Sequence, residues 1–187
     1  MGRIAAALIV AALSANAANP VTGHAADNAV EVNALFLDAA AVQQATGSDF
    51  KSSYTVIEVT VLPKGDKALA IDPEDFLLRI NSDSESSGPM AASQVYGEGG
   101  GLVLHSAQET IGITRTDPGY NGVSVVRGSS SASADTIKEL QNKMLSAKTT
   151  SDAVKGLLFF PIAKKKPRDL DLVYTTPAGN KLHIAFH

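Results

Sequence analysis

Alternation of apolar and polar residues predicts short β-strands along most of the chain. The clearest case is residues 54–62, where Ile57, Val59 and Val61 fall on one face and Glu58 falls on the other. This period of two and the many β-branched side chains favour a strand over a helix. Turn-forming residues such as Pro63 and Gly179 separate it and similar segments. The other predicted strands are residues 30–37, 68–71, 76–80, 156–161, 169–174 and 182–186, with shorter runs at 102–104, 110–114 and 123–126.

The sequence predicts one helix, from Asp135 to about Ala147. Its apolar stripe is narrow (Ile137, Leu140 and Met144), so we expect it to pack at the edge of the strands, with Asp135 capping its start.

The helix belongs to an insertion at about 96–150. This insertion also contains the Gly-rich segment 97–101 and a hairpin turn at Asn121-Gly122. Residues 39–50 are interpreted as a loop.

Seven or more short strands with a single helix indicate a mainly β protein. A βαβ arrangement would require regularly alternating helices. The predicted fold is an antiparallel immunoglobulin-like β-sandwich with one inserted α-helix.

The first residues have the pattern of a signal peptide. Arg3 is followed by an apolar run from Ile4 to Leu13 and then by the small residues Ser14-Ala15-Asn16-Ala17. We therefore predict a signal peptide over residues 1–17. A second cut after Ala25 or Ala26 stays open, because residues 19–23 suit an unstructured leader, and the single domain would then be 27–187. The apolar run is about half of a bilayer span, so the mature chain is predicted to have no transmembrane span and to be periplasmic or extracellular.

Composition narrows the possible chemistry. The 187 residues suffice for one domain, and the absence of cysteine excludes disulfides and thiol catalysis. A net charge of −3, aromatic residues at 5% and no tryptophan argue against nucleic-acid binding.

Four segments carry a family resemblance: residues 54–61, 75–78, 154–161 and 170–174. Together they resemble a family of exported bacterial domains of unknown function with an immunoglobulin-like sandwich, related in fold to secreted immunoprotective antigens. The resemblance implies that fold and transfers no catalytic residue.

No motif predicts a catalytic or cofactor site. Residues 97–101 lack the ending of a phosphate-binding loop, and the serine clusters at 84–87 and 129–133 have no nucleophile elbow. On one strand, His183 and His187 would lie about 13 Å apart, too far for one metal ion. His24 is expected to lie in the leader or to be lost with it, and His105 is expected to face solvent. The carboxylates Asp72, Glu74, Asp75, Asp83 and Glu85 are expected to be solvated at corners and loops rather than to bind calcium.

One concentrated basic run offers a candidate contact. Lys164, Lys165, Lys166 and Arg168 could bind an anionic surface or an acidic partner. Alternatively, they form an exposed loop whose charges discourage aggregation through strand edges.

The sequence thus favours a non-enzymatic exported protein that acts as a binding or accessory module of the cell envelope, with an unknown partner. An alternative is a small-molecule carrier or enzyme with its site between the sandwich and the inserted helix. A subunit of an extracellular assembly is a third possibility.

Overall fold

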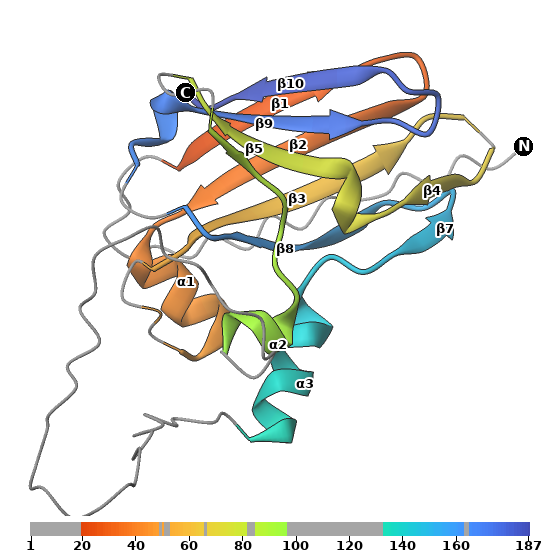
Figure 1. The fold of residues 1–187 in the computed structure, drawn as a ribbon. Coiled ribbons are helices and arrows are strands. Elements are labelled where there is room, and N and C mark those ends of the chain that lie inside the picture. The colour runs from red at the N-terminus through yellow and green to blue at the C-terminus, as the bar shows by residue number, and fades with distance from the viewer. Residues whose placement is uncertain are drawn as a thin grey trace, which may run out of the picture.

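Two four-stranded antiparallel sheets face each other in the protein (Figure 1). The computed structural model describes residues 20–48, 50, 53–65, 67–81, 85–96, 133–162 and 165–187. The first sheet has the order β1 (Val21–Ala26), β2 (Val30–Leu37), β3 (Thr55–Pro63) and β8 (Val154–Phe160). The second has the order β10 (Lys181–Ala185), β9 (Leu170–Thr175), β5 (Phe76–Ile80) and β6 (Ser86–Ser87). A separate pair joins β4 (Leu69–Ile71) to β7 (Lys148–Thr150). The predicted mainly β class with antiparallel sheets is confirmed.

The two sheets share one apolar core. Its largest members are aromatic and branched side chains that alternate along their strands, as the sequence predicts. Residues on the opposite face of β5, such as Leu77, are exposed. The central buried side chains are Ile57, Val59, Val61, Phe76, Leu78, Leu158, Phe160, Leu172, Tyr174, Ile184 and Phe186.

The sheets also meet along one edge, where β1 lies against β10. The backbone of Thr22 exchanges two hydrogen bonds with that of His187, at 3.2 and 2.9 Å. A Cβ atom on Gly23 would lie 2.6 Å from Ile184 Cγ2, so only glycine permits this approach. The expectation of an unstructured leader is therefore wrong for residues 21–23, which form part of a strand.

Three helices are present in the described part of the chain, whereas the sequence predicted one. The segment expected to be a loop contains α1 (Ala39–Thr46). Asp38 caps this helix by accepting a 2.8 Å hydrogen bond from the Ala41 N–H, and Gly47 ends it at φ 75°. The short α2 (Ala92–Val95) was not predicted.

The predicted helix near the end of the insertion is confirmed as α3 (Ala134–Lys143). Its cap is Ser133 rather than Asp135, because the Ser133 hydroxyl accepts from the Thr136 N–H at 3.2 Å. It ends at Lys143, one turn before the expected Ala147. The Gly-rich segment, the hairpin and His105 lie outside the described residues. None of the described helices is both long and apolar enough to cross a membrane.

A second core lies on the outer face of the first sheet. Leu37, Val56 and Phe159 stand in register across β2, β3 and β8, and all three are buried beneath the helices. Val42 of α1 and Leu140 of α3 contribute to this second core, as does Val95 of α2. Figure 1 shows the three helices together at this end of the sheet. The first sheet is therefore packed on both faces, but only at one end.

The main core contains one hydroxyl without a hydrogen bond. The ring of Tyr174 is fully buried and stacks on Phe76, with centroids 4.6 Å apart. Its hydroxyl finds no hydrogen-bond partner among the described residues. Burial raises the pKa of Tyr174 to about 12, and the carboxylates of Asp75 and Asp27 add to this shift.

We predict that Tyr174→Phe raises the free energy of unfolding by about 1 kcal/mol, because it keeps the ring stack and removes an unpaired buried hydroxyl. In the unfolded chain the tyrosine ionises near pH 10, whereas in the folded chain it stays neutral to about pH 12. The wild type should therefore lose stability between these pH values, and the variant should lack this loss. Urea unfolding at pH 8 and pH 11 measures both effects.

Tyr96→Phe is the matched control, since the Tyr96 hydroxyl is paired with Ser48 at 3.0 Å. That variant should be slightly destabilised. A larger loss of stability in Tyr174→Phe than in Tyr96→Phe would contradict the prediction.

Candidate binding cleft

A cleft of about 480 Å³ opens where α2 and α3 approach the sheets. Met90 and Gln94 line it on the α2 side, and Ile137, Gln141 and Met144 line it on the α3 side. A third side is the short turn η1 (Pro73–Asp75) with the preceding Asp72, and Leu158 of β8 contributes to the lining. The cleft therefore lies between the first sheet and the predicted helix.

The two methionine-bearing sides both attach to the free edge of β8. The Met90 N–H donates to the Phe159 carbonyl at 2.8 Å, and the Leu145 N–H donates to the Leu157 carbonyl at 3.0 Å. Met144 also forms a parallel bridge with Leu157. Since the two accepting carbonyls are two residues apart on one strand, β8 sets the spacing between the two sides of the cleft.

Gly156 permits the close approach on the α3 side. A Cβ atom at this position would lie 2.4 Å from both the Cα and the N of Leu145. These are backbone atoms, which cannot move aside as the end of a flexible side chain can. A side chain at residue 156 would therefore force the segment after α3 away from β8.

We predict that Gly156→Ala lowers the free energy of unfolding by about 1–3 kcal/mol, as expected for overpacking in a buried site. Gly88→Ala is the control, because a Cβ atom there would meet nothing within 4 Å. Denaturant midpoints and slopes of the two variants measure the difference. Equal midpoints would show that the Leu145 backbone can approach β8 without a glycine at position 156.

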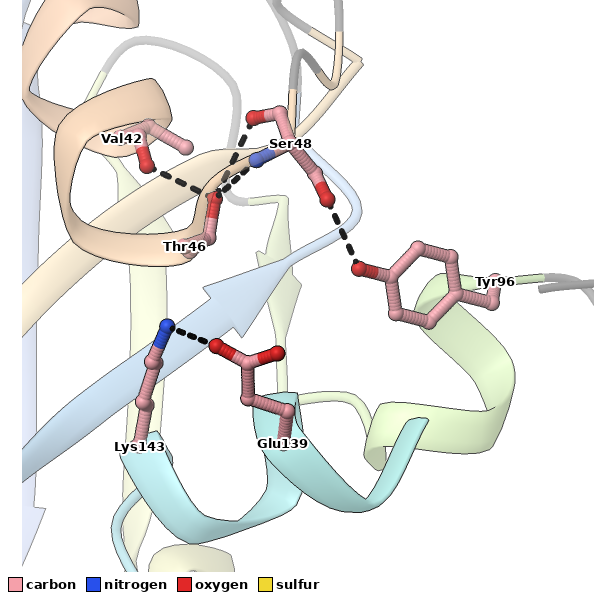
Figure 2. A network of polar contacts seen from close by, with 6 residues as sticks. All are labelled: Val42, Thr46, Ser48, Tyr96, Glu139 and Lys143. Carbon is pink, nitrogen blue, oxygen red and sulfur yellow. Dashed lines mark hydrogen bonds and ion pairs between the residues drawn. The ribbon is translucent and has the colours of Figure 1, made fainter. Parts of the chain in front are cut away.

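The end of α2 is anchored from the α1 side. Figure 2 shows the Tyr96 hydroxyl at the end of α2 meeting the Ser48 hydroxyl beyond the end of α1, at 3.0 Å. The Tyr54 hydroxyl donates to the Val95 carbonyl at 3.1 Å. The ring of Phe50 lies 5.5 Å from the rings of both Tyr96 and Phe159. These contacts position the α2 side of the cleft against the second core.

Three side chains within helices also take part in the polar contacts drawn in Figure 2. The Thr46 hydroxyl donates to the Val42 carbonyl at 2.7 Å and accepts from the Ser48 N–H at 3.2 Å, which closes the last turn of α1. On α3, Lys143 Nζ lies 2.8 Å from Glu139 Oε1, and its hydrogen bond lowers the pKa of Glu139. Because Glu139 is exposed, this pair contributes little stability.

The described lining is mostly apolar and carries acidic groups on one side only. Asp72 and Glu74 are its charged residues, and no lysine, arginine or histidine is among the described lining residues. Its hydroxyls belong to Ser93 and Ser146, and neither hydroxyl contacts a base among the described residues. The arrangement therefore suits ligand binding, and the described lining supplies no nucleophile–base pair.

The acidic side has a defined geometry. Asp72 Oδ1 accepts from the Glu74 N–H at 2.9 Å, which fixes the carboxylate at the start of η1. Burial raises the pKa of the neighbouring Asp75, and the nearby Asp72 and Glu74 carboxylates raise it further. Negative charges thus gather on this turn.

The predicted basic contact residues do not line the cleft. Lys166 and Arg168 are exposed at the short turn η2 (Pro167–Asp169), between β8 and β9. Lys165 is half-buried and is not a free cation, and Lys164 lies outside the described residues. Their role stays a prediction. Lys155 lies near the start of β8 and pairs with Glu58 at 2.8 Å, so it does not extend the basic run.

The histidines within the described residues are exposed and lie apart from the cleft. His183 Nδ1 contacts Asp171 Oδ2 at 2.7 Å across β10 and β9, and His24 Nε2 lies 3.4 Å from Glu31 Oε1 on the outer face of the first sheet. No group of three or more histidine, aspartate or glutamate side chains within the described ranges is placed to hold a metal ion.

Sequence reasoning missed the α2 side of the cleft. Residues 89–96 follow a polar loop and were not assigned to any element. A signal was present, because Ala92, Val95 and Tyr96 have the three- and four-residue spacing of a helix face. For Asp72 and Glu74, the sequence predicts only contact with solvent at a corner.

No protein-family model, curated protein or solved structure matches this chain. The resemblance to exported domains of unknown function therefore stays a prediction. The function is inferred from the geometry of the cleft.

Proposed function

We propose that the protein is a non-enzymatic exported binding module of the cell envelope, and that it takes a small-molecule ligand in the α2–α3 cleft. The cleft itself carries this proposal. Its volume of about 480 Å³ is in the range of sites for small molecules, and its mixture of apolar side chains with a few polar groups is typical of such sites. The ligand site is the one that the sequence offered as an alternative, between the sheets and the helix.

A binding role fits the cleft better than a catalytic one. The Asp72 carboxylate and the Gln94 amide each accept a backbone hydrogen bond within their own turn, at 2.9 and 2.8 Å. These contacts position groups for recognition. The titratable groups of the described lining, Asp72 and Glu74, both stand on the η1 turn, an arrangement that suits recognition of a positive charge.

Support for export comes from residues 1–17, with their basic start, apolar run and small residues. Cleavage after Ala17 would leave β1 complete, whereas cleavage after Ala26 would remove it together with the Thr22–His187 hydrogen bonds. We therefore favour the earlier cut. The mass of the exported protein distinguishes the two.

An immunoglobulin-like topology is part of the proposal. Its support is the strand order, in which β2, β3 and β8 are neighbours in one sheet and β10, β9 and β5 are neighbours in the other. This order resembles the A, B, E and G, F, C neighbours of an immunoglobulin sandwich, with β1 as an added edge strand.

Filling the cleft should abolish ligand binding without unfolding the protein. Ser93→Trp places an indole on the exposed side of α2 that lines the cleft, and Asn142→Trp places the same group on α3 outside it. We predict that a small-molecule panel raises the melting temperature of the wild type and of Asn142→Trp, but not of Ser93→Trp. Identical responses of the three proteins to every bound compound would place binding elsewhere.

A second contact surface is proposed at Lys166 and Arg168, which are exposed on the same turn. Reversing both charges (Lys166→Glu with Arg168→Glu) should weaken retention on vesicles containing phosphatidylglycerol, more strongly at low salt. The control reverses two other exposed lysines, Lys138 and Lys181, and keeps the same total charge. Equal retention of the two variants would remove this turn from the proposal.

A further inference from the structure

We infer that the cleft selects an amphiphile with an apolar body and a protonated amine as its head group. This inference rests on the proposed function, because it specifies the ligand of the same cleft. It follows from the unequal distribution of charge and apolar surface over the sides of the cleft.

The head group is assigned to the η1 side. Asp72 and Glu74 both line the cleft there, and no described lining residue carries a compensating positive charge. The backbone hydrogen bond from the Glu74 N–H occupies one oxygen of Asp72 and orients the carboxylate before any ligand arrives. An ammonium group would meet two carboxylates, whereas an anionic head group would be repelled.

The apolar body is assigned to the α2 and α3 sides. Met90 and Met144 lie on opposite segments that attach to the same edge of β8, and Ile137 lies beside them on α3. Methionine side chains are flexible and adapt to an alkyl chain of irregular path. The glutamines at positions 94 and 141 are neutral, so these sides do not oppose the charge preference set by η1.

Three probes of equal chain length separate charge from apolar contact: octylammonium, octanol and octanoate, all at pH 7. The chain has three methionines, and two of them, Met90 and Met144, line the cleft. In protein labelled with ¹³C at the methionine methyl groups, each probe can be titrated while the Met90 and Met144 signals are followed. Replacement of either residue by leucine assigns the signals.

We expect all titrations to shift the Met90 and Met144 signals, with octylammonium binding about fivefold more tightly than octanol and octanoate binding most weakly. The double variant Asp72→Asn with Glu74→Gln should bind octylammonium and octanol equally. Asparagine at position 72 can still accept the backbone N–H of residue 74, so the turn should persist.

The matched control, Glu85→Gln with Asp152→Asn, removes two exposed carboxylates outside the cleft and should keep the full preference. Equal affinity of the wild type for the three probes would overturn the charge selection and leave the binding cleft in place. A preference that persists in the Asp72/Glu74 variant would overturn the assignment of the head group to η1. No shift of either methionine signal with any probe would overturn both this inference and the proposed function.

Discussion

Apolar side chains on both faces of one strand are the constraint on which the rest of the structure depends. Residues 156–160 of β8 are all buried, so Leu158 and Phe160 face the second sheet while Leu157 and Phe159 face the opposite way. An antiparallel sheet usually leaves one face to solvent. Here that face must be covered where Phe159 and its neighbour Val56 lie, and the three helices provide the cover. Toward the other end of the same face, the residues in register are the polar Thr60 and Lys155, so that end of the face needs no cover.

The helices that cover this face are too short to stand without anchoring. α2 has four residues and α3 has ten, and isolated helices of such length are marginal in water. The segments beside them therefore hydrogen-bond to the edge of β8, one at Phe159 and one at Leu157. The same bonds pair backbone groups that a strand edge would otherwise expose. The space between the two attached segments is the cleft, so its existence follows from how the edge of β8 is satisfied.

Most strands could be predicted from the sequence because one face of each strand must be apolar to pack in the core. Ile57, Val59 and Val61 alternate strictly, and the structure buries all three. β1 alternates weakly, because its inward positions after Val21 are the small residues Gly23 and Ala25, which give little apolar signal; its pairing with β2 and its approach to β10 at Gly23 make it a strand. α1 was missed although Asp38 and Gly47 are ordinary start and stop signals. Its apolar residues are mostly alanines, which give a weak amphipathic signal. Only the outward-facing Phe159 on β8 explains why this segment packs there as a helix.

The cleft could be anticipated only in part. The helix suggested a site beside it, but the opposite side depends on residues 89–96, which are far from β8 in sequence. This segment attaches to β8 through the Met90–Phe159 backbone bond and through packing in the second core, and no local pattern encodes that attachment. The acidic side, in turn, belongs to the main core, because Phe76 follows η1 directly and its ring stacks on Tyr174. The α2 and α3 sides belong chiefly to the second core. A ligand in the cleft would therefore touch parts of both cores. Its binding free energy would stabilise each core and also the position of one core relative to the other.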